Sequence, residues 1–238
     1  MNKPFSNYPG GKEAPGVYQT IINQIPPHVN YIEGFVGNGS VLRHKKPAQG
    51  LNLGIDISRN VIGGWLDLNY PDFEFQLGSW FQFVTSQSFK KHLNHKETFM
   101  FLDPPYRFSS RKSGSKIYEH ELTDSDHDYF LELVKQLDCK IAITHYPDSV
   151  YERELSDWRC IEFTSQTRQG KATELLFMNY DSPVALHDYS HLGADYRERE
   201  KIRKKINRWL ASLDRMPKKE SLAIISAINE RIVKGGSK

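Results

Sequence analysis

Short apolar, β-rich runs alternate with helical stretches along most of this chain, and that alternation constrains its fold more than any other feature. The β-rich runs predict strands over residues 31–36, 51–57, 72–77, 98–102, 141–144, 160–164 and 174–180. The stretches between them predict helices over residues 57–69, 80–94, 124–138 and 149–157. Strands that alternate with helices are typical of an α/β fold with a doubly wound, mostly parallel sheet. The last two strands, joined by the short polar segment 164–173, are expected to pair as an antiparallel hairpin at the sheet edge.

The pattern changes after Pro183. The charged segment 195–213 predicts a helix with one apolar stripe, and a second helix is predicted over residues 220–233. The apolar stripe of the first helix consists of Ile202, Ile206, Trp209, Leu210 and Leu213. We therefore expect an α/β domain over residues 1–183, followed over residues 184–238 by a basic helical hairpin that is a candidate DNA-binding element.

Composition narrows the class of protein. The chain has 238 residues, a mean hydropathy of −0.60 and no long apolar run, which excludes a membrane-spanning protein. Its two cysteines, Cys139 and Cys160, are too few for a disulfide framework or a zinc cage. Both lie in apolar runs, so we interpret them as buried thiols in a reducing compartment. The N-terminus lacks the apolar core of a secretion signal, which predicts a cytoplasmic location. The formal net charge of +3 is too small to establish a nucleic-acid partner.

The strongest motif is Asp103-Pro104-Pro105-Tyr106, which follows the fourth predicted strand. In open α/β sheets, ligands bind at the carboxyl ends of the strands. Two consecutive prolines fix the backbone and remove two donors, so the turn offers two bare acceptors, the Asp103 carboxylate and the Pro104 carbonyl. These acceptors suit an exocyclic amine, which has two N–H donors, and Tyr106 adds a ring for stacking on a planar base. The structural alternative is a rigid turn with a capping aspartate.

A glycine-rich loop, Glu33-Gly-Phe-Val-Gly-Asn-Gly-Ser40, follows the first predicted strand. Gly37 and Gly39 let a ligand approach the backbone, and the start of the next helix favours polar or anionic groups. Leu42 occupies the position of the third glycine of a dinucleotide fingerprint, and no Lys-Ser/Thr pair follows. The loop therefore matches neither an NAD fingerprint nor a Walker loop, and a plain turn is the alternative.

Two weaker features accompany these motifs. Asp56 ends the second predicted strand, where an acid commonly accepts hydrogen bonds from ribose hydroxyls; the alternative is the N-cap of the next helix. Tyr8-Pro-Gly-Gly-Lys12 is a glycine turn before the first strand, and alone it would be an ordinary turn.

Together, in this order, the four motifs resemble the Dam-like family of S-adenosylmethionine-dependent DNA adenine-N6 methyltransferases. The signatures of that family are an early aromatic-x-Gly-Gly-Lys, a Phe-x-Gly-x-Gly loop, an acid after the second strand, and Asp-Pro-Pro-Tyr. The resemblance covers roughly residues 3–181, and residues 186–213 also resemble the tail of a phage- and prophage-associated branch. One departure is Gly34, where the family usually has proline; it removes no contacting group.

The resemblance implies a Rossmann-like class I methyltransferase fold, S-adenosylmethionine as cofactor, no metal, and a bacterial or phage-infected host cell. By family position, the cofactor site would contain Tyr8, Lys12, Phe35, Gly37, Gly39, Asp56 and Asp103. The catalytic residues would be Asp103, Pro104 and Tyr106: the first two accept hydrogen bonds from the N6 amine of a flipped-out adenine, and Tyr106 stacks on the base. Holding the amine protons exposes the nitrogen lone pair for in-line attack on the cofactor methyl group.

DNA is expected at basic segments. The loop 107–118 contains four basic residues and no acids, and a second basic segment links the last two strands. The candidate DNA-binding residues are Lys12, Arg107, Arg111, Lys112, Lys116, Arg168 and Lys171. Lys12 is assigned to the cofactor pocket, to DNA phosphate, or to both. For the loop and for the charged helix 195–213, a solvated surface is the alternative.

The interval between the third strand and Asp103 is short. Dam-like enzymes usually carry a large recognition domain there, whereas this chain has only the predicted helix 80–94. Either the basic loop and the C-terminal helices read the sequence, or recognition is short or relaxed. The acidic and histidine-rich segment 119–128 resembles a metal cluster, but Thr123 and Asp126 predict a helix capping box instead. His145 is interpreted as a packing residue near the target pocket.

Three other functions remain open from the sequence: an RNA adenine-N6 methyltransferase, a DNA cytosine-N4 methyltransferase, and a catalytically idle nucleic-acid-binding module. The oligomeric state is left open between a monomer and a weak dimer.

Overall fold

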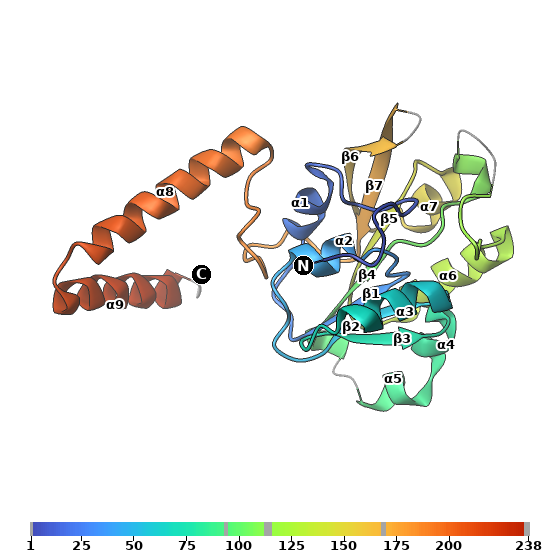
Figure 1. Ribbon diagram of the computed structural model, residues 1–238, viewed down its shortest axis with the longest axis horizontal. Helices are drawn as coiled ribbons and strands as arrows, with labels where there is room; N and C mark the ends of the chain where they lie inside the picture. The colour runs from blue at the N-terminus through green and yellow to red at the C-terminus, as the bar shows by residue number, and fades with distance from the viewer. Residues whose placement is uncertain (1, 93–94, 112–115, 168–169, 236–238) are drawn as a thin grey trace. The chain divides into compact units, whose positions relative to one another are not determined.

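The computed structural model describes residues 2–92, 95–111, 116–167 and 170–235. Its centre is a seven-stranded sheet with the strand order β3-β2-β1-β4-β5-β7-β6 (Figure 1). The strands are β1 Asn30–Gly34, β2 Asn52–Asp56, β3 Glu74–Leu77, β4 Thr98–Leu102, β5 Lys140–His145, β6 Arg159–Thr167 and β7 Gly170–Met178. Strands β1 to β5 pair in parallel, and β7 pairs antiparallel with both β5 and β6. The predicted doubly wound sheet with an antiparallel edge hairpin is confirmed.

Helices cover both faces of this sheet (Figure 1). Those of the α/β unit are α1 Val17–Ile22, α2 Ser40–His44, α3 Arg59–Leu68, α4 Trp80–Thr85, α5 Gln87–His92, α6 Asp124–Gln136 and α7 Ser149–Glu154. Two short 3₁₀ turns, η1 His95–Glu97 and η2 Phe108–Ser110, flank β4.

The core forms two apolar clusters, one on each face of the sheet. Successive residues of a strand point to opposite faces, so Tyr31 belongs to one cluster and Ile32 to the other. The first cluster includes Trp65 of α3, and the second includes Trp80 of α4 and Phe130 of α6. Every residue of β2 and β4 is buried, as expected for parallel strands covered on both faces.

The helix predicted over residues 80–94 is wrong as a single element. The chain forms α4 and α5 instead, because Ser86 takes an extended conformation and its hydroxyl accepts a hydrogen bond from the Phe89 N–H at 3.2 Å. Residue 94 lies outside the described residues. The short helices α1 and α2 were not predicted, since helices of five or six residues carry too little periodicity to be seen in the sequence.

The two cysteines differ in their surroundings. Cys139 is buried, as predicted, and burial raises its pKa to about 12. Cys160 is exposed, so the prediction of a second buried thiol is wrong. It lies on β6, which has a partner strand on only one side, and the alternate positions Cys160, Glu162 and Thr164 of this edge strand are all exposed.

The chain divides into two compact units, Met1–His191 and Leu192–Lys238. The segment before the boundary packs on the first unit: the His187 N–H donates to the Ile25 carbonyl at 2.9 Å, and the Asp188 carboxylate accepts from the Lys46 N–H at 2.8 Å. The second unit contains the predicted pair of consecutive helices, α8 Tyr196–Asp214 and α9 Lys218–Gly235.

Candidate functional site

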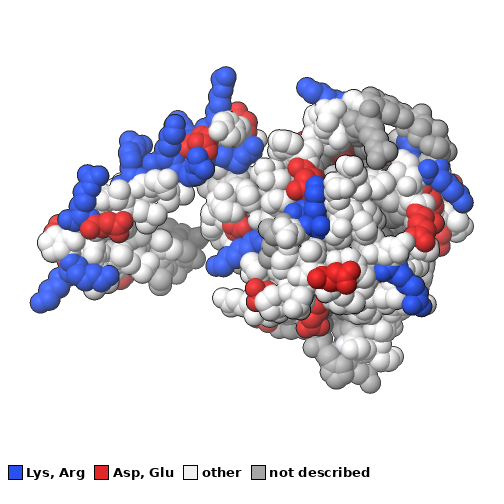
Figure 2. Space-filling view, in the orientation of Figure 1, with Lys and Arg blue, Asp and Glu red and all other residues white. Residues whose placement is uncertain are grey.

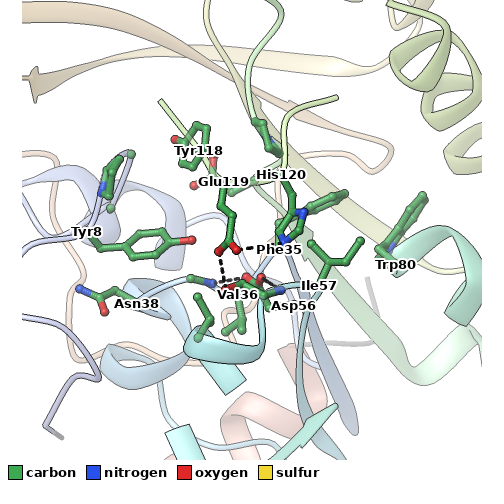
Figure 3. A pocket seen from close by; sticks show the side chains of 18 of the residues that line it. Tyr8, Phe35, Val36, Asn38, Asp56, Ile57, Trp80, Tyr118, Glu119 and His120 are labelled. Carbon is green, nitrogen blue, oxygen red and sulfur yellow. Dashed lines mark hydrogen bonds and ion pairs between the residues drawn. The ribbon is translucent and has the colours of Figure 1, made fainter. Parts of the chain in front are cut away.

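The candidate site is a cavity of about 810 Å³ at the carboxyl ends of β1, β2 and β4. The strand order reverses between β1 and β4, and such a switch point is where open α/β sheets bind ligands. Three of the four sequence motifs reach the cavity directly from these strands, because the glycine loop follows β1, Asp56 ends β2, and Asp103 follows β4. The fourth motif, Tyr8 to Lys12, also lines the cavity, and Figure 3 shows Tyr8 at its side.

The glycine loop is tight and leaves no room for side chains at its two key positions. Gly37 and Gly39 have φ values of 46° and 55°, in the left-handed region that favours glycine. A Cβ at Gly37 would lie 2.6 Å from the Tyr8 ring, and one at Gly39 would lie 2.6 Å from the Trp65 ring. Phe35 also has a positive φ, 59°, which is unusual for a bulky residue and marks this loop as strained.

Asp56 holds the glycine loop to the next strand. Its carboxylate accepts hydrogen bonds from the Gly37 N–H at 3.0 Å and from the Ser58 N–H at 2.9 Å. Burial raises the pKa of Asp56, and these hydrogen bonds oppose the rise. Ser58, rather than Asp56, occupies the N-cap position of α3, so the helix-cap interpretation of Asp56 is wrong.

Asp103 directly follows the carboxyl end of β4 and belongs to a group of charged side chains that are largely buried, together with Lys12 and Glu174. One carboxylate oxygen accepts from the Lys12 ammonium at 2.6 Å, and the other accepts from the Thr144 hydroxyl at 2.6 Å. The Lys12 side chain is only 5% exposed. Burial opposes its charge, but the carboxylates of Asp103 and Glu174 outweigh that effect and raise the pKa of Lys12. Burial also raises the pKa of Asp103, while Lys12 lowers it.

Glu174 is a member of this group that the sequence did not reveal. It lies on β7, is 4% exposed, and has a carboxylate oxygen 3.6 Å from the Lys12 nitrogen. The same oxygen accepts a hydrogen bond from the Tyr106 hydroxyl at 2.7 Å. The Tyr106 ring is buried, with the Tyr146 ring at 4.5 Å and the Lys12 ammonium at 5.2 Å. Glu174 is the one acid of β7 and directly precedes the apolar residues 175–178, and this is the sequence signal that could have indicated it.

A second missed feature is the segment that covers the cavity, residues 116–121, which we call the roof. Glu121 organises it: its carboxylate accepts from both terminal nitrogens of Arg111, at 2.8 and 2.5 Å, and from the Ile117 and Tyr118 N–H groups, at 2.7 and 3.0 Å. Burial works against the charge of Glu121, yet these donors lower its pKa to about 2. The Tyr118 hydroxyl packs against Gly10, where a Cβ would collide with it.

Two side chains of the roof, Glu119 and His120, point into the cavity towards Asp56 (Figure 3). Glu119 accepts a hydrogen bond from the Ser58 hydroxyl at 3.3 Å, so it meets the loop after β2. The end of the roof leads into α6, where Thr123 and Asp126 form the predicted capping box. Among the described residues, no three His, Cys, Asp or Glu side chains come together as a metal-binding group.

The predicted DNA-binding residues lie in different settings. Arg107 and Arg111 are buried; Arg107 pairs with Asp124 at 3.0 Å, and Arg111 pairs with Glu121 as described. Lys116 lines the cavity and Lys171 is exposed at the start of β7. Lys112 and Arg168 lie outside the described residues. Contact of these residues with DNA stays a prediction.

His145 is fully buried, as its interpretation as a packing residue requires. Its Nε2 accepts a hydrogen bond from the Arg107 N–H at 3.0 Å, and its ring stacks on Tyr151 with the centroids 3.9 Å apart. Burial lowers its pKa to about 3. It therefore supports the turn after Asp103 as a neutral acceptor.

The departure at Gly34 has a packing explanation. A Cβ at this position would lie 2.6 Å from the Trp80 ring and 2.7 Å from a Leu102 methyl group. Trp80 is the first residue of α4, one of the short helices between β3 and β4. This is the interval in which Dam-like enzymes usually carry a recognition domain. The space that a proline ring would need is taken by this tryptophan.

Comparisons with known proteins show similarity in structure only. No family model matches the chain, and no curated protein matches it in sequence. One similar solved structure is a magnesium protoporphyrin IX methyltransferase from Synechocystis PCC 6803 with bound SAM, at 14% identity over 69% of this chain and 76% of that chain, with a TM-score of 0.43. A prophage-encoded protein of Escherichia coli, assigned as a DNA modification methyltransferase, matches at 14% identity over 63% of this chain and 46% of that chain, with a TM-score of 0.41. A SAM-dependent methyltransferase from Agrobacterium tumefaciens matches at 11% identity over 68% of this chain and 58% of that chain, with a TM-score of 0.44.

No helix among the described residues is both long and apolar enough to cross a membrane.

Proposed function

We propose that this protein transfers a methyl group from S-adenosylmethionine to the N6 amine of adenine in DNA. The observation that carries the proposal is that the Asp103 carboxylate, the first of the two acceptors of the Asp103-Pro104 turn, lines the cavity at the switch point of the sheet. The acceptors suit an amine, and the cavity suits a nucleoside cofactor.

The residues of the cavity fit S-adenosylmethionine. The tight backbone at Gly37 and Gly39 lets a ligand lie directly on the loop, and a side chain at either position would collide with its neighbours. Asp56 has acceptor capacity left for ribose hydroxyls, since an ionised carboxylate accepts about four hydrogen bonds and this one receives two from the loops. Ile57, an exposed apolar residue at the cavity, offers a surface for the adenine ring. When bound, the cofactor supplies an electrophilic methyl group.

Asp103 and Pro104 would activate the target amine. Lys12 and Thr144 occupy one acceptor position on each Asp103 oxygen, which leaves capacity for an N–H of the base. The lone pair of the exocyclic amine is delocalised into the adenine ring. Drawing its protons into hydrogen bonds with Asp103 and Pro104 favours an sp³ nitrogen with an available lone pair. The base must leave the duplex to reach this turn, and Tyr106 is the ring beside it.

The roof would close the cofactor pocket, and the Arg111–Glu121 pair that holds the roof in place gives a prediction. Replacing Arg111 by alanine removes two charge-assisted hydrogen bonds from Glu121 and frees the segment that carries Tyr118 to His120. We expect the affinity for S-adenosylmethionine to fall by about 10- to 100-fold, because such bonds contribute about 1.5–3 kcal/mol. Isothermal titration of the cofactor measures the change.

The same variant separates two roles for Arg111. If this residue acts through the roof, DNA affinity without cofactor stays within about twofold of the wild type. An unchanged cofactor affinity together with a weakened DNA affinity would instead assign Arg111 to phosphate contact. Ser110→Ala is a neighbouring control that leaves the guanidinium pair intact.

Helix α8 is proposed as a DNA contact. Basic side chains gather along it (Figure 2), and one open groove on α8 is lined by Arg197, Lys201, Lys204 and Arg208 with only one acid, Glu200. Their spacing of three or four residues places them on one face of the helix. Phosphate binding by such a face depends steeply on salt, because each contact releases a counterion.

A charge reversal tests that face. Lys201→Glu combined with Lys204→Glu should weaken DNA binding uniformly across sequences and reduce the slope of log affinity against log salt by about 2, roughly one for each lost contact. Fluorescence anisotropy at several salt concentrations measures the slope. Lys90→Glu, at an exposed lysine on α5, is the matched control. An unchanged slope in the double variant would show that α8 does not contact phosphate.

Transfer of a labelled methyl group to different acceptors tests the proposed function. Purified protein should label plasmid DNA from tritiated S-adenosylmethionine and leave transfer RNA unlabelled. Labelled RNA would favour an RNA methyltransferase, and DNA binding without transfer would favour an idle module. Sequencing of the modified plasmid then separates relaxed recognition from a single dominant motif.

A further inference from the structure

Glu174 creates an unusual charge balance at the acceptor side of the site. Two carboxylates, Asp103 and Glu174, surround one ammonium, Lys12, with N···O distances of 2.6 and 3.6 Å. The side chains of Lys12 and Glu174 are each 5% exposed, so water screens their charges weakly. An ion pair of Lys12 with Asp103 alone would be neutral, whereas this group carries a net negative charge.

That surplus charge lies on β7, a strand that is paired on both sides, with β5 and with β6. Glu174 is the first buried position of β7, and the apolar positions Leu176, Phe177 and Met178 follow it. A buried carboxylate costs free energy unless it is paired, and here it also raises the pKa of the neighbouring Asp103. Buried acids whose charges disfavour one another are characteristic of functional sites.

Methyl transfer to an amine moves positive charge towards this group. The N6 nitrogen forms a bond to the methyl carbon while the carbon–sulfur bond breaks and its electron pair stays on sulfur. The nitrogen becomes positive and then gives up one proton to the Asp103 carboxylate, from which the proton passes to water. A negative charge fixed beside the amine stabilises the transition state more than the ground state, because the positive charge arrives there only as the reaction proceeds.

Resting on the proposed function, we infer that Glu174 is a positioning residue for methyl transfer: it supplies the net negative charge of the acceptor side and keeps Asp103 a strong acceptor by sharing Lys12. It also fixes the Tyr106 ring through the 2.7 Å hydrogen bond. The electrostatic part of this role is the larger one, and it separates from the hydrogen bond by mutation.

Glu174→Gln removes the charge and keeps an acceptor for the Tyr106 hydroxyl. We expect kcat for DNA methylation to fall by about 10- to 100-fold, while the dissociation constants for S-adenosylmethionine and for DNA stay within about threefold. Tyr106→Phe, which keeps the charge and loses the hydroxyl, should lower kcat by less than about fivefold. Glu174→Asp keeps the charge on a shorter side chain and should restore most of kcat. Glu162→Gln, at an exposed acid on β6, is the control.

The pH profile gives a readout that packing alone would not move. Besides Glu174, the groups that shift the pKa of Asp103 are the Lys12 ammonium and the Thr144 hydroxyl. The charge of Asp103 in turn acts on the carboxyl group of Glu33 on β1 and on four phenols, those of Tyr8, Tyr106, Tyr118 and Tyr146. Burial raises the pKa of all four phenols, so they stay neutral. Removing Glu174 removes a cause that raises the pKa of Asp103, so the acid limb of kcat should move to lower pH in Glu174→Gln.

The outcomes separate this inference from the proposed function. A wild-type protein that methylates no adenine overturns both. An active wild type with Glu174→Gln unchanged in kcat overturns the inference alone, and so does a Tyr106→Phe variant that loses as much as Glu174→Gln. Should Glu174→Gln not fold, equal losses in Glu174→Asp and Tyr106→Phe would overturn the inference, and near-wild-type kcat in Glu174→Asp alone would support it.

Discussion

Replacing Asp103 by alanine should lower kcat for DNA methylation by about 10³-fold, the upper end of what removing one preorganised electrostatic contact costs an enzyme. The carboxylate is the acceptor that draws the amine protons away from the ring, and the Pro104 carbonyl alone cannot hold both. Lys12 keeps a counter-charge in the variant, since the Glu174 carboxylate lies 3.6 Å from its nitrogen. The site therefore loses an acceptor without gaining an unpaired buried ion. Single-turnover transfer of a tritiated methyl group measures the effect.

Asp103→Asn is the matched control for shape. It keeps an acceptor oxygen but no charge, and we expect an intermediate loss of about 10- to 100-fold. Cofactor binding and the melting temperature, measured in parallel, separate chemistry from folding. Equal kcat in wild type and Asp103→Ala would contradict the proposed mechanism.

Replacing Lys12 by methionine should lower the free energy of unfolding by about 3–5 kcal/mol at neutral pH, the usual cost of leaving a buried charge without its partner. The variant retains the buried Glu174 carboxylate and the largely buried Asp103 carboxylate, which have both lost the ammonium that lay between them. Urea denaturation measures the loss. Lys96→Met, at an exposed lysine beside β4, should change stability by no more than about 0.5 kcal/mol.

The pH dependence of that loss follows from the direction of each pKa shift. In the wild type, the folded-state pKa of Lys12 is raised, so its contribution is fully present below the unfolded value and is lost only in alkali as pH rises through the folded value. In Lys12→Met, the largest cause that lowers the pKa of Asp103 is gone and only the Thr144 hydrogen bond still lowers it, so that pKa rises further. A raised carboxyl pKa means stability that declines as pH rises through it, so the variant should approach wild-type stability in mild acid. A loss that is constant from pH 5 to 8.5 would contradict this account of the charged group.

The sequence predicted those parts of the site that are encoded locally. The glycine loop and the Asp103 turn follow buried strands whose composition identifies them, and parallel strands bring their carboxyl ends to one edge. The pairing of Lys12 with Asp103 across 91 positions could be inferred only as a shared pocket, because no local pattern specifies it.

Long-range partners account for what the sequence missed. Glu174 reads as an ordinary polar residue of a strand until β7 is placed beside β5, which brings it to Tyr106 and Lys12. Arg111 reads as a free basic residue because Glu121, its partner, lies beyond a segment that has no regular structure in the sequence pattern. The break at Ser86 was missed for the opposite reason, since a single extended residue interrupts an otherwise helical composition.

Nucleoside mass spectrometry of DNA treated with the protein and S-adenosylmethionine tests the central claim most directly. Plasmid from a host without adenine methylation should gain N6-methyladenine and no N4-methylcytosine, and the same DNA treated with Asp103→Ala should gain neither above background. N4-methylcytosine as the product, or no methylated nucleoside from a folded protein that binds the cofactor, would contradict the account.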